Sequence, residues 1–413
     1  MSEKSRVDEL AALGGAPAFA SELHVGRPSI RGREALLCRL NDVFESQWLT
    51  NHGPCEVELE RRLGYVFGVE HCVATCNGTL ALQLLLRALG LRGTVLVPSF
   101  TFIATAHAVS WEGLTPVFCD VLTADHTLSP EAVEAAMTAD VSAILGVHLW
   151  GNPCAVDALR VIAERHGVPL IFDAAHAFAC ERRGKPVGSL GDAEVFSFHA
   201  TKVFQTLEGG AIATADDALA RELRLLRDFG IAGPDRSIRV GTNAKMNEVS
   251  AAMGLAALEH LPEVIDDNRK RHELYVALLS GIPGVKVLCP SDENTSNYQY
   301  VVVDVDERRA ELDRDSLGKI LHAEGVLARR YFSPGCHRAE PYAERPGAGE
   351  RSLPVTDALS ARVLVLPTGP ALSLNDVRGV ASIVRLAVEH APRVREAAQR
   401  LAPGPFWYAA EPM

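Results

Sequence analysis

The sequence predicts an α/β protein in which a mostly parallel sheet lies between helices, followed by a smaller C-terminal α+β domain. Between about residues 70 and 215, short apolar runs alternate with amphipathic segments of helical period. The runs are apolar on both sides, as buried parallel strands are, and strands that alternate with helices need crossover connections. After about residue 262 this alternation ends, and charged helical segments predominate.

In the first region, the local sequence pattern predicts each strand and each helix. We expect strands at 71–76, 93–99, 115–121, 141–150, 168–176, 193–199 and 209–214. Helices are expected between them at 77–90, 103–113, 130–139 and 155–167. In the first of these helices Leu80, Leu84 and Leu85 fall on one face, Asn77 can cap the start and Gly90 can end it.

The sequence pattern after about residue 262 predicts a second, smaller domain. Helices are expected at 263–285, 314–326 and 373–391, with a strand at 298–306. We therefore expect a large domain at 1–262, which includes the N-terminal segment, and a small domain at 263–400. Residues 401–413 are rich in proline and alanine, which predicts a flexible tail.

Composition excludes several classes of protein. The chain has 413 residues, 47% of them hydrophobic, which allows a large core. A net charge of −11 argues against a nucleic-acid partner, which normally requires a basic face. Nine cysteines without a CxxC pair favour reduced thiols and a cytoplasmic location. No signal peptide or membrane-spanning run is apparent, so we expect no membrane association.

Three groups of polar residues follow predicted strands. Asn77-Gly78-Thr79 opens a helix, where free N–H groups suit a phosphate. Asp173 ends an apolar strand, and a buried carboxylate is costly unless it is paired. Lys202 follows another strand, and burial would lower the pKa of its amine and make it a nucleophile. Taken singly, each has an ordinary structural explanation: a helix cap, a turn aspartate and an end-of-strand lysine.

Taken together, the three groups point to pyridoxal 5′-phosphate. This cofactor needs a lysine for its aldehyde, a carboxylate for its pyridinium nitrogen and a cradle for its phosphate. The chain offers all three at strand ends of one predicted sheet, where ligands of open parallel sheets gather. The combination is more specific than any one of its members.

A family resemblance adds to this interpretation. The segments CNGTLAL, PSFTF, FDAAHAF, SFHATK, EGGAIAT and GTNAKMNEVSAAMGL together resemble the sugar-nucleotide aminotransferases of deoxysugar biosynthesis. The similarity covers about residues 20–395. It implies the fold-type-I architecture of pyridoxal-phosphate transferases, a role in secondary-metabolite or antibiotic biosynthesis, and a homodimer whose active sites lie at the subunit interface.

The resemblance also assigns roles to individual residues. It makes Lys202 the lysine bonded to the cofactor and Asp173 the partner of the pyridinium nitrogen, and both are the expected catalytic residues. It places His176 beside the ring hydroxyl and Phe102 on the ring. The expected phosphate contacts are the backbone N–H groups of Gly78 and Thr79, the hydroxyl of Ser197, and Asn243 from the neighbouring subunit. Tyr331 and His337, in YFSPGCH, are expected near the substrate.

Asn243 is assigned across the dimer for a second reason. Its segment, GTNAKMN, lies outside the parallel-sheet region and has no obvious route to its own cofactor. One position departs from the family pattern: Leu207 stands where many relatives have glycine before EGG. The resemblance therefore does not predict the conformation of that loop.

SFHATK is similar to the enzymes that aminate C4 of the sugar, whereas C3 enzymes more often carry Tyr-Pro-x-Lys or His-Pro-x-Lys. The resemblance implies that L-glutamate converts the cofactor to pyridoxamine 5′-phosphate, which then aminates dTDP-4-keto-6-deoxy-D-glucose. Alternatives are a C3 aminotransferase, the galacto-configured C4 product, a sugar dehydratase or a non-catalytic regulator. Dehydratases carry histidine at the position of Lys202, and an intact Asp173 and Lys202 argue against a regulator.

Overall fold

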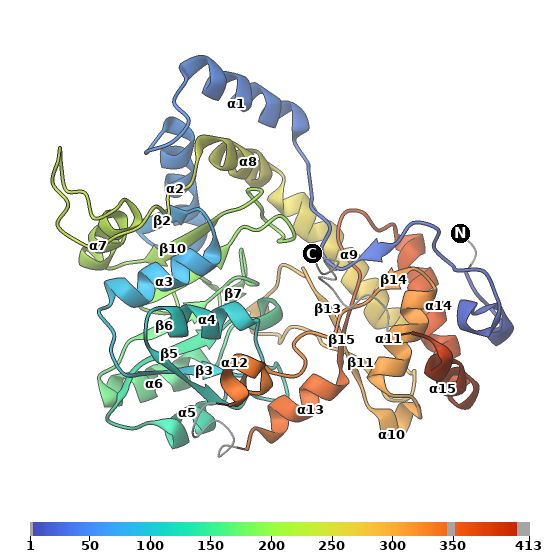
Figure 1. The fold of residues 1–413 in the computed structure, drawn as a ribbon. Coiled ribbons are helices and arrows are strands. Elements are labelled where there is room, and N and C mark those ends of the chain that lie inside the picture. Colours follow the sequence, from blue (N-terminus) through green and yellow to red (C-terminus); the bar gives the residue numbers. More distant parts are fainter. Residues whose placement is uncertain (1–2, 345–351, 403–413) are drawn as a thin grey trace.

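The computed structural model describes residues 3–344 and 352–402, and its main element is a seven-stranded sheet (Figure 1). The strand order is β2-β10-β9-β6-β5-β3-β4. The strands are β2 (His71–Thr75), β3 (Thr94–Pro98), β4 (Thr115–Cys119), β5 (Val141–Val147), β6 (Leu170–Asp173), β9 (Ala193–Ser197) and β10 (Gly210–Thr214). All neighbouring pairs are parallel except those of β10, which is antiparallel to both β2 and β9.

The antiparallel direction of β10 follows from the short segment that connects it to β9. A parallel neighbour of β9 would need a crossover of a dozen or more residues, usually a helix, and the residues between β9 and β10 contain no helix. Predicted strands 193–199 and 209–214 therefore form an antiparallel pair, with Gly210 opposite Ser197. The prediction of a mostly parallel sheet is confirmed.

Helices cover both faces of this sheet. One face packs against α3 (Gly78–Ala88), α4 (Ile103–Trp111) and α7 (Asp217–Arg227), and the other against α2 (Pro54–Phe67), α5 (Pro130–Ala136), α6 (Val156–His166) and α8 (Glu248–Glu259). Alternate strand residues enter opposite core clusters: Ile171 faces the first group, whereas Leu170 and Phe172 face the second. Burial on both faces explains why the strands are apolar throughout.

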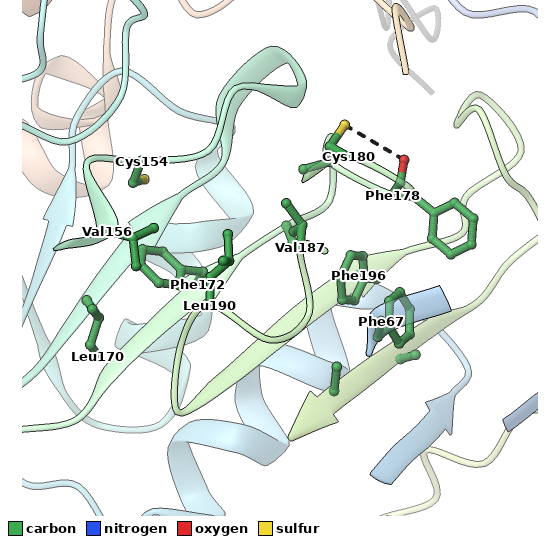
Figure 2. Packing of buried hydrophobic residues seen from close by; sticks show 14 of the residues in the cluster. Phe67, Cys154, Val156, Leu170, Phe172, Phe178, Cys180, Val187, Leu190 and Phe196 are labelled. Carbon is green, nitrogen blue, oxygen red and sulfur yellow. Dashed lines mark hydrogen bonds between the residues drawn. The ribbon is translucent and has the colours of Figure 1, made fainter. Parts of the chain in front are cut away.

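Aromatic side chains fill the second face near β9 and β10. Phe67 stacks on Phe196 with ring centroids 4.0 Å apart, and Phe178 meets Phe67 edge-on at 5.7 Å (Figure 2). This packing lies directly under the strand that leads to Lys202 and holds that strand in place. A small sheet of β7 (Glu181–Arg182), β8 (Lys185–Pro186) and β12 (Asn294–Thr295) lies in the connections.

The C-terminal region has its own core. A three-stranded antiparallel sheet, β11 (Val285–Val287), β13 (Val301–Val305) and β15 (Val363–Leu366), packs against α9 (Leu261–Leu279), α11 (Arg314–Ala323), α14 (Leu374–Glu389) and α15 (Ala391–Arg400). The predicted helix 263–285 ends earlier, at Leu279, because Gly281, Pro283 and Gly284 follow and β11 begins at Val285. Shorter helices are α10 (Glu307–Ala310), α12 (Glu340–Ala343) and α13 (Pro354–Arg362).

The N-terminal residues pack with this second core. The short turns η1 (Val7–Glu9) and η2 (Ala11–Leu13) place Val7 and Leu10 in its apolar cluster, and β1 (Leu23–His24) pairs in parallel with β14 (Val326–Leu327). This differs from the predicted grouping of 1–262, since apolar contacts here join segments more than 250 residues apart. The boundary near residue 262 stays a prediction, and most of the predicted tail lies outside the described residues.

Helix α1 (Arg33–Ser46) lies at the top of the view in Figure 1, next to α8. In the parts of the chain that the structure covers, no helix has the length and apolar character needed to cross a membrane.

Candidate active site

The strand directions bring the predicted site residues to one edge of the large sheet. Strands β2, β6 and β9 run the same way, because β2 and β9 are both antiparallel to β10 and β6 is parallel to β9. The residues that follow their carboxyl ends therefore meet at this edge: Asn77 and Gly78 after β2, Asp173 at the end of β6, and Lys202 after β9.

Asp173 is buried and well oriented. Its Oδ2 accepts a hydrogen bond from Thr105 Oγ1 at 2.8 Å, and its Oδ1 accepts one from the Ala175 N–H at 3.0 Å. Burial raises the pKa of this carboxyl, while the two hydrogen bonds and the charge of Lys202 oppose the rise. The carboxylate is therefore costly to bury and gains from a cationic partner, such as a protonated ring nitrogen.

Lys202 lies in a turn after β9, where its N–H donates to the carbonyl of His199 at 2.9 Å. Burial lowers the pKa of its amine to about 8, although the charge of Asp173 acts in the opposite direction. The amine is thus partly neutral near physiological pH and can act as a nucleophile and as a proton carrier. Each of the two charges thus favours the charged form of the other group, Asp173 by raising the pKa of Lys202 and Lys202 by lowering that of Asp173.

His176 is buried under an aromatic cluster. Its Nδ1 accepts a hydrogen bond from the Trp150 N–H at 3.4 Å, and the Trp150 ring stacks on the imidazole with centroids 5.7 Å apart. Tyr300 approaches the same ring at 4.5 Å. Burial, with a smaller effect of Lys202, holds the pKa of His176 well below its ordinary value, so the imidazole is neutral. A neutral imidazole can exchange hydrogen bonds with a phenolic hydroxyl.

The start of α3 has the form of an anion cradle. Asn77 caps it by accepting the Leu80 N–H at 2.8 Å, and the N–H groups of Gly78 and Thr79 occupy the first turn, where an anion can bind. Gly78 lies against Ser197: a Cβ at Gly78 would come within 2.9 Å of the Ser197 Cβ. The hydroxyl-bearing residue and the helix start therefore belong to one small site.

The conformation of the loop around Leu207 is defined by the backbone of Leu207. Leu207 has φ of 66°, in the left-handed region that favours glycine, which explains why many relatives carry glycine there. Its N–H donates to Gln205 Oε1 at 2.8 Å, which holds this conformation. Gly210 is required for a different reason, because a Cβ there would come within 2.7 Å of the Gly78 nitrogen.

Phe102 and Asn243 lie on the outside of the single chain. Phe102 precedes α4 and is 58% exposed, and Asn243 is exposed in the loop that follows α7. The loop lies outside the strands, as expected, but it contacts the edge of its own sheet, since the carbonyl of Ala244 accepts the Cys76 N–H at 2.8 Å, beside the end of β2. Backbone pairing at that edge could not be read from the sequence. The roles of Phe102 and Asn243 stay predictions.

Tyr331 and His337 have different surroundings. Tyr331 joins the aromatic cluster, 6.2 Å from Trp150 and 6.4 Å from Tyr300. His337 is held by Ser99 Oγ, 2.6 Å from Nδ1, and by Asp357, 3.3 Å from Nε2. Both nitrogens of His337 thus have protein partners, which favours a structural role, whereas Tyr331 remains a candidate substrate contact.

Sequence reasoning missed three residues that contact the predicted site residues: Thr105, Trp150 and Tyr300. Thr105 lies within a predicted helix and Trp150 at the end of a predicted strand, without a motif to mark them. Their roles depend on contacts between segments far apart in the chain. Only the position of Trp150 after β5, at the sheet edge where ligands gather, offered a signal.

Comparison with known proteins identifies the family of the chain. A model of the DegT/DnrJ/EryC1/StrS aminotransferase family matches residues 31–385, so the chain belongs to this family of sugar aminotransferases. A dTDP-4-amino-4,6-dideoxy-D-glucose transaminase from Shigella dysenteriae is 35% identical over 368 residues, which cover 88% of this chain and 98% of the relative. The predicted family and enzyme class are confirmed.

Two solved structures share the fold. The crystal structure of DesI in the presence of its TDP-sugar product is 49% identical, covers 95% of this chain and 100% of that chain, and superposes with a TM-score of 0.91. The structure of DesV from S. venezuelae in complex with a ketimine intermediate is 32% identical, covers 87% and 95% of the two chains, and has a TM-score of 0.81. The predicted fold class is confirmed.

Proposed function

We propose that this protein transfers the amino group of L-glutamate to C4 of dTDP-4-keto-6-deoxy-D-glucose and gives dTDP-4-amino-4,6-dideoxy-D-glucose. The main supporting observation is that one edge of the sheet holds the buried Asp173, the start of α3, and Lys202, whose amine has a lowered pKa. The names of the Shigella relative and of the DesI structure support the choice of substrate. We place the reaction in deoxysugar biosynthesis for a secondary metabolite.

The site residues fit pyridoxal 5′-phosphate. The first turn of α3, with Gly78, Thr79 and Ser197, forms a cradle that a Cβ at Gly78 would obstruct. Asp173 would hold the pyridinium nitrogen, His176 the ring hydroxyl, and Phe102 one face of the ring. When bound, this cofactor supplies an aldehyde for the amino group and a ring that accepts electrons from the carbon losing its proton.

The residues themselves have four tasks. Lys202 Nζ would hold the aldehyde of the cofactor in the resting enzyme, and its free amine would carry a proton from and to the substrate carbon. Asp173 would keep the ring nitrogen protonated, because a buried carboxylate gains most from a full positive charge beside it. Thr105 fixes the orientation of that carboxylate through its hydrogen bond at 2.8 Å. Trp150 and Tyr300 enclose His176 and exclude water from it.

We further propose that the enzyme is a homodimer in the cytoplasm. Helix α1 buries only Val43 among its described residues and leaves Leu37 and Phe44 48% and 58% exposed. Further exposed apolar side chains lie near it in the sequence or in the loop after α7: Trp48, Leu49, Val57, Phe229, Ile231, Ile238 and Val240. A second copy would cover such a surface. The nine free thiols support a reducing compartment.

An assay with product analysis tests the proposed reaction. The purified holoenzyme is incubated with L-glutamate and dTDP-4-keto-6-deoxy-D-glucose, and the sugar product is analysed by NMR. We expect 2-oxoglutarate and a 4-amino sugar of gluco configuration in equal amounts. Amination at C3, a galacto product or loss of a sugar hydroxyl without amino transfer would each contradict the proposal and identify one of the alternatives.

A further inference from the structure

A tight turn after β9 carries Lys202. The chain turns at residues 199–202, and the Lys202 N–H donates to the carbonyl of His199 at 2.9 Å, which is the hydrogen bond that closes a β-turn. Within the described part of the chain, the Lys202 backbone forms no other hydrogen bond. The direction in which the amine leaves the backbone therefore depends on the conformation of the two central residues of the turn, Ala200 and Thr201.

The side chain of His199 contacts the centre of this turn. Its Nδ1 lies 2.9 Å from Thr201 Oγ1 and accepts the Thr201 N–H at 3.3 Å. An imidazole nitrogen that accepts an N–H carries no proton, so the ring proton is on Nε2, which lies 3.6 Å from Glu208 Oε1. The Glu208 carboxylate thus favours the ring orientation in which Nδ1 faces Thr201.

The far side of the turn is held by another segment. Gln299 donates from Nε2 to the Thr201 carbonyl at 3.2 Å and accepts the Val203 N–H at Oε1, also at 3.2 Å. The Thr201 carbonyl belongs to the peptide group that leads to Lys202, whereas the Thr201 N–H belongs to the preceding peptide group. His199 therefore holds the peptide group between Ala200 and Thr201, which Gln299 does not contact.

His199 also contacts the phosphate cradle. Its N–H donates a long hydrogen bond of 3.5 Å to Ser197 Oγ, and Ser197 lies against Gly78 at the start of α3. The side chain of His199 is 42% exposed, so it contributes little to the apolar core. Its contacts are directed instead to the residues on either side of it that lead into the site.

Ala200 leaves the turn without a constraint of its own. It occupies the second position of the turn, where proline is favoured because its ring fixes φ near −65°. Neither Ala200 nor Thr201 has a positive φ, and in the described residues the Ala200 N–H forms no hydrogen bond that proline would remove. The turn can therefore accept proline at position 200, and in this chain the imidazole of His199 supplies the missing restraint.

We propose that His199 is a positioning residue for Lys202: its imidazole holds the turn 199–202 in one conformation and so keeps the amine in place for proton transfer. This inference rests on the proposed function, which gives Lys202 that task. The rival role is direct chemistry, in which the exposed imidazole itself acts on the substrate. A proline at position 200 can replace a restraint on the backbone but cannot replace an acid or a base, so it separates the two roles.

The first measurement is turnover by the holoenzyme. His199→Ala should lower kcat by about 10- to 100-fold, because a small displacement of the proton carrier slows the chemical step. The KM for glutamate and the KM for the ketosugar should each change by less than about threefold, since no substrate contact is lost. Adding Ala200→Pro to His199→Ala should raise kcat again by about fivefold or more, because the proline ring restricts the turn.

The second measurement needs neither cofactor nor substrate. In the cofactor-free enzyme, competitive acetylation gives a reactivity midpoint for Lys202, and burial lowers the pKa of this amine to about 8. A looser turn lets water reach the amine, so the midpoint of His199→Ala should lie at a higher pH. The double variant should return toward the midpoint of the unaltered enzyme. A loss of stability elsewhere in the chain would not move this midpoint.

Two variants serve as controls. His166 on α6 resembles His199 in its surroundings, because its Nε2 lies 3.6 Å from Glu134 Oε1 and its side chain is 34% exposed. His166→Ala should leave both kcat and the Lys202 midpoint unchanged. Ala200→Pro by itself should also retain turnover within about twofold, since the turn already has a conformation that proline can adopt.

Four outcomes would overturn the inference: an unchanged kcat in His199→Ala, an unchanged Lys202 midpoint in that variant, a double variant no better than His199→Ala, or loss of turnover in Ala200→Pro alone. The third would assign the imidazole to direct chemistry. Failure of the unaltered enzyme to aminate the ketosugar would instead refute the proposed function, and the acetylation measurement would still test the turn.

Discussion

At the scale of single residues, the proposed function depends on an amine whose surroundings lower its pKa. Two other lysines with little exposure have carboxylate partners: Lys4 pairs with Glu324 at 2.6 Å and Lys245 with Asp228 at 2.6 Å. Lys202 instead interacts with Asp173 at longer range, and burial dominates.

The first prediction concerns the identity of the reactive lysine. Lys202→Ala should abolish turnover without lowering the free energy of unfolding, because burying an amine costs free energy that alanine does not. Borohydride treatment of the unaltered holoenzyme should attach the cofactor to the peptide that contains Lys202. Lys270, which is 53% exposed, is the control, and Lys270→Ala should retain full turnover. Attachment to any other lysine would refute the assignment.

The second prediction concerns pH. In the enzyme freed of cofactor, Lys202 should be protonated below pH 8 and neutral above it, since burial lowers its pKa to about 8. Competitive acetylation followed by mass spectrometry should therefore give a reactivity midpoint near pH 8 for Lys202, while ion-paired Lys245 reacts slowly. Asp173→Asn should move the midpoint lower, because the Asp173 charge raises this pKa. A higher midpoint in that variant would contradict the proposed pairing.

At the scale of elements, buried charges join α2, β2 and the end of α7. Arg227, at the last residue of α7, is fully buried and pairs with Glu56 at 2.8 Å and Glu60 at 2.7 Å on α2. Its guanidinium also donates to the carbonyl of Ala74 on β2 at 2.6 Å. The network therefore fixes the strand that leads into the phosphate cradle relative to the loop that carries Asn243.

The third prediction tests this network. Arg227→Met should lower the free energy of unfolding by about 3–5 kcal/mol, because it leaves the buried Glu56 and the half-buried Glu60 without their cation. Denaturant unfolding measures the change. Arg61→Met is the matched control on α2: its pair with Glu58 is exposed, so we expect a loss below about 1 kcal/mol. Equal losses in the two variants would show that burial of the pair is not what matters.

At the scale of the whole molecule, apolar side chains are exposed on α1, on the residues that follow it and on the loop after α7. In Figure 1, α1 lies at the top of the view and the loop after α7 at its left. These exposed side chains make up the surface that we propose for dimer contact. Phe102 is exposed as well, although we expect it to stack on a cofactor ring. Both features are explained if a second copy covers this surface and completes the site.

The fourth prediction follows for the oligomeric state. Phe44→Asp places a charge on the exposed face of α1 and should convert the dimer to a monomer, because an uncompensated carboxylate in an apolar interface is costly. Light scattering during size exclusion measures the mass. Val161→Asp, on α6, is the control: Val161 is similarly exposed, at 59%, but lies away from this surface. A dimer that withstands Phe44→Asp and dissociates with Val161→Asp would place the interface elsewhere.

The fifth prediction concerns the sharing of active sites. Lys202→Ala and Asn243→Ala subunits are mixed and allowed to exchange. If Asn243 serves the partner, both lesions of a mixed dimer fall on one site and the other is whole, so activity should partly return. Asn243→Ala alone must first weaken cofactor binding measurably, since one hydrogen bond to a phosphate contributes about 1.5–3 kcal/mol. Absence of recovery despite proven exchange would assign Asn243 to its own subunit.

The sequence alone determined the alternation of strands and helices, and it predicted that Asp173 and Lys202 lie at one edge of the sheet. These follow from local rules: an apolar run followed by a polar residue marks the end of a buried strand, whichever other segments pack around it. The cap at Asn77 is equally local, and the structure has it where the sequence predicts it.

Only the tertiary structure decided which distant segments complete the site. Thr105 on Asp173, Trp150 on His176 and Tyr300 on His176 are contacts between elements that no periodicity relates. The antiparallel course of β10, the packing of the N-terminal turns on the second core, and the pairing of Ala244 with Cys76 are of the same kind. Such contacts depend on how buried surfaces fit together in space, whereas a sequence pattern records only which surfaces must be buried.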